Sequence, residues 1–532
     1  MRTFLPAKAD WTAATPRDVV AGLTVAVVAL PLALGFGVAS GLGAAAGLAT
    51  AIVAGALAAV FGGSSLQVSG PTGAMTVVLV PIVATFGPGG VLTVGLLAGV
   101  LLLALAVAKA GRYMRYVPAP VVEGFTIGIA AVIALQQIPA ALGVPTPDGH
   151  NVVVNAVRAF GSGPALPAVA LAGGVVVVML VGARWKPAIP FSLLAVAMGT
   201  VVAEIWSLPV PRIGALPALL PAPSLSFLDL GALWSLLPSA VAVAALAALE
   251  SLLSATVADG MSVNQRHHPD RELFGQGIAN LITPLFGGVP ATAAIARTAV
   301  NVRSGATSRL AALVHAVTLA VIMLAAAPVV GRIPLAVLAG VLLATAVRMV
   351  EVGSVRVLMR ANRSDALVLA LTAIATLALD LVTAVIVGLV VAGALALRAV
   401  ARSARIDEEP LEPGDHTLEE HDLLAQHIVA YRLDGPLFFA AAHRFLLELT
   451  EIAAVSVVIL RMSRVSTMDG TGVLVLRDAV ERLERRGVTV LLSGVRDEHR
   501  RQLEIHGVRT FATTPEAIEH ARSHLRRIGT LP

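Results

Sequence analysis

Residues 62–75 read Gly-Gly-Ser-Ser-Leu-Gln-Val-Ser-Gly-Pro-Thr-Gly-Ala-Met, a polar and glycine-rich stretch that leads into a long apolar run. A second stretch of the same kind, residues 287–298, reads Gly-Gly-Val-Pro-Ala-Thr-Ala-Ala-Ile-Ala-Arg-Thr. Proline is favoured in the first turn of a helix, where its missing N–H costs nothing. We therefore predict that Pro71 and Pro290 each mark the N-terminus of a half-helix that begins inside an apolar environment.

The composition indicates that this environment is a lipid bilayer. Of the 532 residues, 57% are hydrophobic and 13% are charged, and the mean hydropathy is +0.85, which exceeds what a soluble core needs. Apolar runs of about 20 residues, enough to cross a bilayer as helices, follow one another without the alternation of a β-barrel. We predict fourteen helical spans, at residues 19–36, 43–62, 66–86, 92–110, 118–138, 165–183, 189–207, 236–256, 272–287, 288–304, 309–328, 333–350, 365–380 and 382–400.

The positive charges predict the orientation of these spans. An even number of spans places both termini on one side, and arginine and lysine mark the cytoplasmic side. They cluster after the even-numbered spans, so both termini are expected to be cytoplasmic, in a multi-pass protein of the plasma or inner membrane. The clusters are Lys109, Arg112 and Arg115; Arg184 and Lys186; Arg266 and Arg271; Arg303 and Arg309; Arg348, Arg356, Arg360 and Arg363; and Arg398, Arg402 and Arg405.

The two halves of the membrane region match one another at a nearly constant spacing. Seven spans separate the copies, and because seven is odd, the second copy must enter the bilayer from the opposite face. Such inverted repeats are typical of secondary transporters, and here they cover about residues 17–207 and 236–401. The matches are residues 38–42 with 257–261 (257 − 38 = 219), Pro71 with Pro290 (290 − 71 = 219), and Pro118 and Gly124 with Pro334 and Gly340 (334 − 118 = 216).

The symmetry of the repeat makes the two half-helix N-termini face one another near the midplane. Each presents free N–H groups, such as those of Gly73 and Ala74, and the positive end of a helix dipole, which together favour an anion. The hydroxyls of Thr72 and Thr292 and the positive charge of Arg297 add to this site. Two alternatives remain open: Gly-Pro that only kinks a packed helix, and an arginine that snorkels to the interface.

Glu250 is a carboxylate in the middle of an apolar span. Such residues are costly in a membrane and usually line a cavity where they carry protons or ions, although a glutamate that is hydrogen-bonded for packing remains an alternative. The repeat aligns it with Pro31 (250 − 31 = 219), so spans 1, 3, 8 and 10 converge on one site. We interpret His315 as a packing residue. No cofactor, metal cage, hydrolase triad or nucleic-acid partner is expected, and the chain contains no cysteine.

Several of these stretches resemble the SulP family of anion transporters. They are residues 29–41, 67–75, 249–261, 275–280 and 294–299. The resemblance implies a fourteen-span 7+7 inverted repeat with core and gate domains, followed by a cytoplasmic STAS domain, in a homodimer. It also implies an anion site lined by Leu32 and Phe36 on span 1, Glu250 and Ser254 on span 8, and Ala296 and Arg297 on span 10.

The resemblance also bears on the driving ion. Sodium-coupled bicarbonate members of the family carry Asp and Thr where this chain has Glu250 and Ser254. A longer carboxyl suits a proton better than sodium, so we favour proton-coupled symport of a small inorganic or carboxylate anion such as sulfate, bicarbonate or a dicarboxylate. The alternatives are a sodium-coupled bicarbonate symporter, an uncoupled exchanger or channel of the same fold, and a membrane-bound regulator that signals through the C-terminal domain.

The last part of the chain has a different composition. We assign residues 1–405 to the transport domain, the acidic residues 406–425 to a linker, and residues 426–532 to a small domain. Strands at 428–433, 455–460 and 488–493 alternate with helices near 441–452 and 472–486, which predicts an α/β sheet. It resembles a STAS domain, and residues 468–472 resemble the loop that carries a phosphorylated hydroxyl in anti-sigma-factor antagonists, here at Thr471.

Overall fold

The computed structural model describes residues 4, 11, 14–147, 151–186, 189–262, 265–379, 381–410, 424–438, 455–505 and 509–529. The chain forms two compact units, residues 1–389 and 390–532, and the boundary falls within a continuous helix, α15. The first unit is helical and the second contains a five-stranded sheet.

Apart from the short 3-10 helices, the helices and strands of the first half of the membrane unit recur in a similar order in the second half. The first half contains α1 (Pro16–Ala39), α2 (Ala44–Phe61), β1 (Ser69–Gly70), α3 (Gly73–Val107), η2 (Ala110–Tyr116), α4 (Ala119–Leu142), α5 (Val152–Phe160), α6 (Leu166–Trp185) and α7 (Phe191–Ile205). The second contains η3 (Leu230–Ala232), α8 (Leu233–Met261), α9 (Pro269–Ile282), η4 (Thr283–Phe286), β2 (Thr292–Ala293), α10 (Ile295–Arg303), α11 (Leu310–Val330), α12 (Leu335–Met349), α13 (Val352–Ala361), α14 (Arg363–Ala378) and α15 (Leu381–Arg402).

This order agrees with a repeat, and one glycine explains its main irregularity. α3 corresponds to α10 and α11 together. It covers the two predicted spans at 66–86 and 92–110, and Gly87, at φ 69°, interrupts its helical backbone between them. Among the described residues, nine helices are long and apolar enough to cross a bilayer. α9, α10 and α14 are shorter than that length. The inverted relation of the halves and the count of fourteen spans remain predictions.

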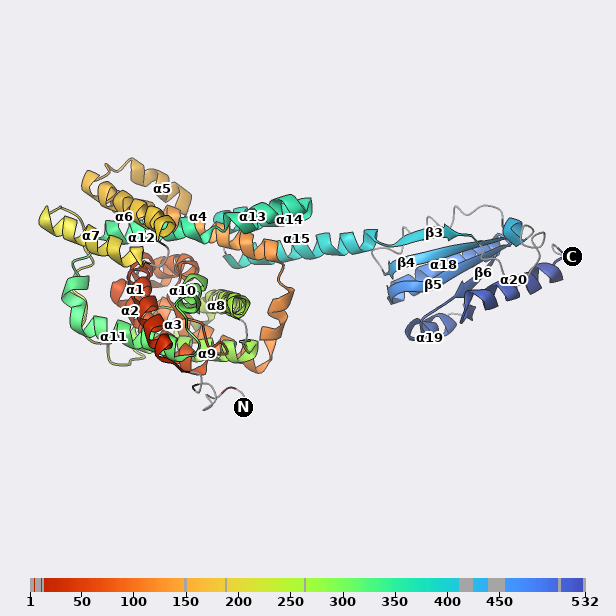
Figure 1. The fold of residues 1–532 in the computed structure, drawn as a ribbon, viewed down its shortest axis with the longest axis horizontal. Helices are drawn as coiled ribbons and strands as arrows, with labels where there is room; N and C mark the ends of the chain where they lie inside the picture. The colour runs from red at the N-terminus through yellow and green to blue at the C-terminus, as the bar shows by residue number, and fades with distance from the viewer. Residues whose placement is uncertain are drawn as a thin grey trace. The chain divides into compact units, whose positions relative to one another are not determined.

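The helices of the membrane unit pack in two groups (Figure 1). In one group, α1 packs on α2, α10 and α11, α2 and α3 pack on α9, and α8 packs on α3 and α10. In the other, α4 packs on α12 and α14, and α12 packs on α6 and α7. Contacts of α1 with α12 and α7, and of α3 with α4, join the groups. The first group contains both interrupted helices and therefore the candidate site.

Glycine allows the closest approach of helices within the first group. A Cβ atom on Gly47 of α2 would lie 2.0 Å from the carbonyl oxygen of Ala33 and 2.8 Å from the Cα of Gly37, both in α1. Small residues at such contacts let membrane helices associate through their backbones. The α1–α2 contact therefore has no room for a single methyl group.

We expect Gly47→Ala to lower the unfolding midpoint of the purified protein, because the clash is with backbone and overpacking costs about 1–3 kcal/mol. The matched control is Gly174→Ala in α6, where an added Cβ meets nothing within 4 Å. That variant should keep the wild-type midpoint or exceed it. Thermal unfolding in detergent measures both, and equal midpoints would contradict the assigned α1–α2 packing.

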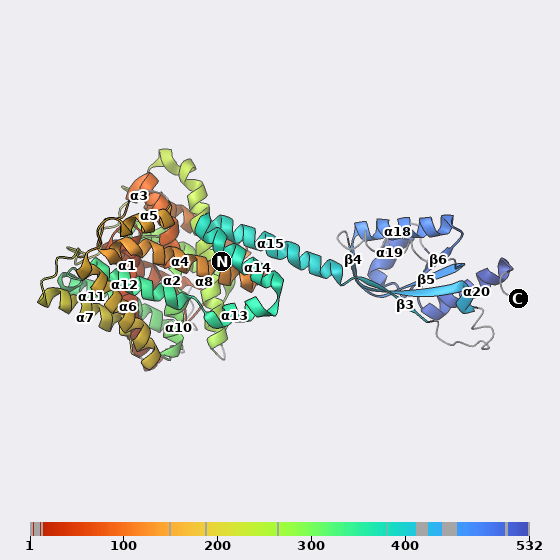
Figure 2. The ribbon, with the colours of Figure 1, turned by 90° about the horizontal axis from the view of Figure 1, so that it is seen from above.

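The second unit is a sheet covered by helices on both faces. Its strand order is β3 (Arg405–Glu409), β4 (Ile428–Leu437), β5 (Val457–Met468), β6 (Thr489–Ser493) and β7 (Thr510–Phe511). β3 is antiparallel to β4 and the other pairs are parallel. One apolar core joins the sheet to α18 (Gly470–Arg485) and to Leu503 of α19 (Asp497–Ile505), and another joins it to α20 (Thr514–Arg527) (Figure 2).

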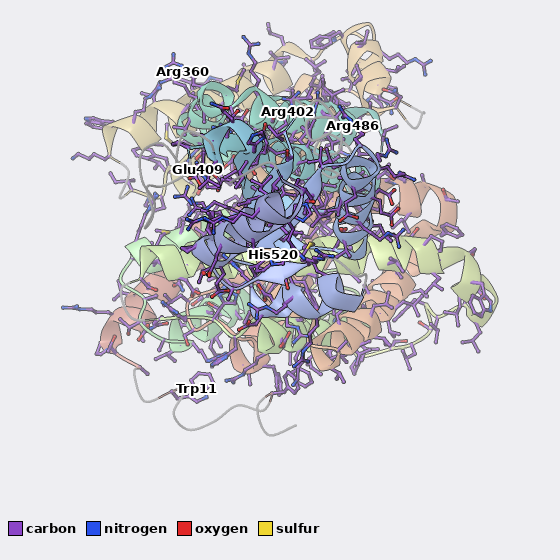
Figure 3. The ribbon with its side chains drawn as sticks, turned by 90° about the vertical axis from the view of Figure 1, so that its right-hand side faces the viewer. Trp11, Arg360, Arg402, Glu409, Arg486 and His520 are labelled. Carbon is purple, nitrogen blue, oxygen red and sulfur yellow. The ribbon has the colours of Figure 1, made fainter. Side chains whose placement is uncertain are left out.

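The structure differs from the sequence interpretation at the start of this unit. Residues 406–409, assigned to the linker from their acidic composition, instead belong to β3. Glu409, labelled in Figure 3, forms ion pairs with Arg432 of β4 and Arg461 of β5, which offset its charge at the sheet edge. The predicted helix at 441–452 lies outside the described residues. Thr471 is exposed in the first turn of α18.

Candidate functional site

A short antiparallel ladder joins the two interrupted helices. In it Ser69 of β1 pairs with Ala293 of β2, and Gly70 pairs with Thr292. The N–H of Ala294 also donates to the carbonyl oxygen of Val68 at 3.2 Å. Because α3 starts three residues after β1 ends and α10 starts two residues after β2 ends, the ladder fixes the two helix N-termini relative to one another.

The ladder corrects one detail of the sequence analysis. Neither proline occupies the first helical turn: Pro71 precedes the N-cap residue Thr72, and Pro290 lies before β2. The segments after each glycine-rich stretch are extended because they pair with one another before their helices begin. Only a contact between distant parts of the chain reveals this pairing, so the local rule for proline placed the helix starts too early.

Glu250 of α8 bridges the two interrupted segments. Its Oε2 atom accepts hydrogen bonds from the hydroxyl of Thr72 at 2.9 Å and from that of Thr292 at 2.6 Å. The two hydroxyl oxygens lie 3.1 Å apart. Glu250 is partly exposed, whereas both threonines are buried. A carboxyl group that reaches both halves of the chain thus remains accessible.

The helix N-termini differ in how they are capped. The Thr72 hydroxyl accepts from the N–H of Met75 at 3.4 Å and caps α3. The N-cap of α10 is Ala294, whose side chain has no polar atom, and Ala296 in the first turn is exposed. The first N–H groups of a helix have no partner within it. The α10 terminus therefore presents donors at an accessible position.

Arg297 lies behind this terminus and is 1% exposed. Its Nη2 atom donates to the carbonyl oxygen of Pro71 at 2.8 Å, across the ladder. Its Nη1 atom lies over Gly70, where an added Cβ would be 2.4 Å away. The charges of Arg297 and Glu250 act on one another, but the two side chains form no ion pair within 4 Å. Arg297 therefore does not snorkel to the membrane interface. It belongs to the region where the two interrupted segments meet, residues 68–72 and 292–297, which we call the crossing.

The other predicted residues take several positions. Phe36 lies against Gly73, where an added Cβ would meet its ring at 3.1 Å. Leu32 and Ala74 are buried. The hydroxyl of Ser254 is 2.9 Å from that of Thr298, to which the N–H of Val68 also donates. Ser254 is therefore bonded to the scaffold of the crossing, and its side chain is wholly buried.

Several polar side chains that hold the two interrupted segments together were not expected from the sequence. Asn280 of α9 both accepts from the N–H and donates to the carbonyl of Ala291, at 2.8 and 2.9 Å. The Ser251 hydroxyl accepts from Ala293 N–H at 3.2 Å, and the Gln276 side chain donates to Ser69 Oγ at 2.7 Å. Their one signal in sequence is that they are polar residues within predicted spans, which does not identify their partners.

We expect Asn280→Asp to lower the thermal unfolding midpoint, because a carboxylate cannot donate a hydrogen bond to the Ala291 carbonyl. That carbonyl would then be buried without a donor, at a cost of about 1–3 kcal/mol. The matched control is Asn151→Asp. Asn151 caps α5 and only accepts, from Val153 N–H and Val154 N–H, which aspartate does equally well. A midpoint unchanged in both variants would contradict the role assigned to Asn280.

Long apolar helices together with two interrupted helices that meet within the bundle are features of membrane transporters, and comparisons give the family. The description "Sulfate permease family" matches residues 16–372, and "STAS domain" matches residues 423–521. The chain belongs to the sulfate permease family, whose members are membrane transporters and not enzymes. The resemblance to SulP transporters with a C-terminal STAS domain is confirmed.

Individual relatives agree over nearly the whole chain. YvdB of Bacillus subtilis, a candidate sulfate transporter by its name, is 35% identical, covering 92% of this chain and 94% of its own. The bicarbonate transporter BicA of a Picosynechococcus species is 32% identical, covering 92% and 90%. The murine anion transporter Slc26a9 in its inward-facing state has the same fold, with a TM-score of 0.83 at 16% identity over 98% of this chain and 94% of that one.

Proposed function

We propose that this chain is a secondary active transporter of small anions that couples transport to protons through Glu250 and works by alternating access. The observation that supports it most directly is the contact of Glu250 with Thr72 and Thr292. This contact brings a titratable group to the point where two helix N-termini meet. A bound anion and a bound proton would then share one set of side chains.

The proposed anion position is the accessible side of the two N-termini. Free N–H groups and helix dipoles favour negative charge without regard to its chemical type, and the buried charge of Arg297 adds to them. Phe36 and Leu32 of α1, Gly73 and Ala74 of α3, and Ala296 of α10 would border the anion. The names of relatives specify sulfate and bicarbonate, so these two anions are the substrates to test first, followed by the dicarboxylates that the family resemblance adds.

A count of hydrogens supports the idea that Glu250 can take up a proton without losing its contacts. Three oxygen–oxygen contacts join its Oε2 atom and the hydroxyls of Thr72 and Thr292, at 2.6, 2.9 and 3.1 Å. Each contact needs one hydrogen, and each threonine hydroxyl supplies one. A protonated carboxyl supplies the third by donating to one threonine, whose own hydroxyl then donates to the other threonine while that one donates to Oε2. Protonation thus completes the triangle, and ionisation leaves one contact without a hydrogen.

The packing of the helices supports alternating access. Polar side chains tie α3, α8, α9 and α10 together at the ladder, and α1 packs on α10 and α3. The main contacts with α4, α7 and α12 come from α1 and α3. We propose that the first group moves as a body against the second. A homodimer in the plasma or inner membrane, with both termini cytoplasmic, completes the proposal and follows from the family resemblance and the arginine distribution.

The decisive experiment is uptake of labelled sulfate and labelled bicarbonate into proteoliposomes under separate proton and sodium gradients. An inward gradient of about one pH unit can drive about tenfold accumulation in one-to-one symport, since 1.4 kcal/mol is tenfold. We expect wild-type uptake to follow the proton gradient. Glu250→Gln should lose this response but keep anion exchange, because the amide mimics the protonated carboxyl.

The matched control is Glu204→Gln, which removes a surface carboxylate that pairs with Arg212 at 2.7 Å and should leave the proton response unchanged. Equal proton responses of wild type and Glu250→Gln would refute the coupling role. Uptake that follows sodium would favour the sodium symporter, and uptake that follows neither ion would favour an exchanger or channel.

A further inference from the structure

His315 is a buried titratable residue that the proposed mechanism does not use. It lies in α11, is 0% exposed, and neither ring nitrogen has a hydrogen-bond partner among the described residues. A neutral imidazole has one donor and one acceptor, and buried polar groups in native proteins are almost always paired. The interpretation of His315 as a packing residue therefore leaves its two ring nitrogens without an explanation.

Arg297 has a matching unpaired group. Its Nη2 atom is bonded to the carbonyl of Pro71, but its Nη1 atom is buried and has no partner among the described residues. A guanidinium has donors only. The group that Nη1 needs is thus an acceptor, which one nitrogen of a neutral histidine supplies.

One face of α2 borders both unpaired groups. An added Cβ on Gly55 would lie 3.7 Å from His315 Nδ1 and 3.4 Å from the carbonyl oxygen of Ser69. One on Gly70 would lie 2.4 Å from Arg297 Nη1 and 3.3 Å from the Cα of Ala51. Ala51 and Gly55 are four residues apart and share a helix face. The charge of Arg297 also acts on the His315 ring.

The repeat shows that the two residues occur together in one copy only. The positions that correspond to Arg297 and His315 at the offset of 219 are Val78 (297 − 219 = 78) and Leu96 (315 − 219 = 96), both apolar. The polar pair is thus a feature of the second repeat, beside the half-helix that begins at Ile295.

We propose that His315 is a positioning residue for Arg297. Through one ordered water that accepts from Nη1 and donates to the ring, His315 completes the hydrogen bonding of the guanidinium, and the Ser69 carbonyl is a third partner for that water. With Nη2 held on Pro71 and Nη1 held toward α11, the positive charge is fixed in direction. Its effect on transport rests on the proposed function; the contact itself does not.

The test is a double-mutant cycle of Arg297→Lys and His315→Leu in the full-length protein. The first readout is the unfolding midpoint in anion-free buffer, where the double variant should lose less than the sum of the single losses, because neighbouring residues in one network are not additive. The second is the apparent Kd for sulfate and for bicarbonate from anion-dependent thermal shifts. His315→Leu should raise this Kd about threefold or more when Arg297 is intact, and leave it nearly unchanged in the Arg297→Lys background.

Two further variants separate positioning from packing. His315→Gln keeps a donor and an acceptor and should restore most of the anion affinity and the KM for uptake. His315→Met keeps the volume without an acceptor and should behave like His315→Leu. If His315→Leu does not fold, His315→Met takes its place in the cycle. Thr318→Val removes a polar group from the same helix, one that is bonded to the Val314 carbonyl, and should change neither Kd nor KM.

Additive unfolding midpoints would overturn the proposal, and so would equal affinities of the Gln and Met variants in the case where His315→Leu itself raises the Kd. A different result would overturn the proposed anion site alone. In that case neither Arg297→Lys nor His315→Leu would change the Kd for sulfate or bicarbonate, while the unfolding midpoints would still not be additive. That outcome would keep the contact between His315 and Arg297 and remove its role in anion binding.

Discussion

The bilayer offers no hydrogen-bond partner to backbone, and this constraint shapes the centre of the molecule. An interrupted membrane helix exposes N–H and C=O groups that protein must satisfy. Here each interrupted segment satisfies the other through the β1–β2 ladder, in which Gly70 pairs with Thr292. Asn280 and Ser251 pair with backbone groups of the second segment in the same way. The polar residues at the crossing are thus needed first for folding, and the site is built on them.

The same constraint explains where the sequence analysis succeeded. Long apolar runs and arginine clusters predict a multi-pass helical protein, because hydropathy is a local property of the chain. The glycine-proline stretches and Glu250 stand out for the same reason, since each departs from an apolar background. Thr72, Thr292 and Arg297, chosen from these stretches alone, do lie within the crossing, and the family comparison independently agrees with the resemblance that the stretches carry.

The sequence was less informative where partners come from distant segments. Thr298, Asn280 and Gln276 look like ordinary polar residues in a span, and only the fold shows that they bond to the ladder or its flanks. The strand β3 was missed because its acidic residues are typical of a linker, and their pairing with Arg432 and Arg461 depends on strands further along the chain. Ser254, which the family resemblance places in the anion site, is hydrogen-bonded to Thr298, a partner that the sequence does not reveal.

Charge balance gives the proposed coupling a physical reason. Arg297 is buried near the crossing, and a lone buried charge is costly in a low-dielectric environment. With the site empty, an ionised Glu250 offsets that charge; with a monovalent anion bound, the anion offsets it and Glu250 is better neutral. Proton and anion then enter together because either alone would leave net charge in the membrane. A divalent anion such as sulfate would leave one negative charge even with Glu250 protonated, so the same balance favours bicarbonate-like monoanions unless a second proton or the helix N-termini compensate.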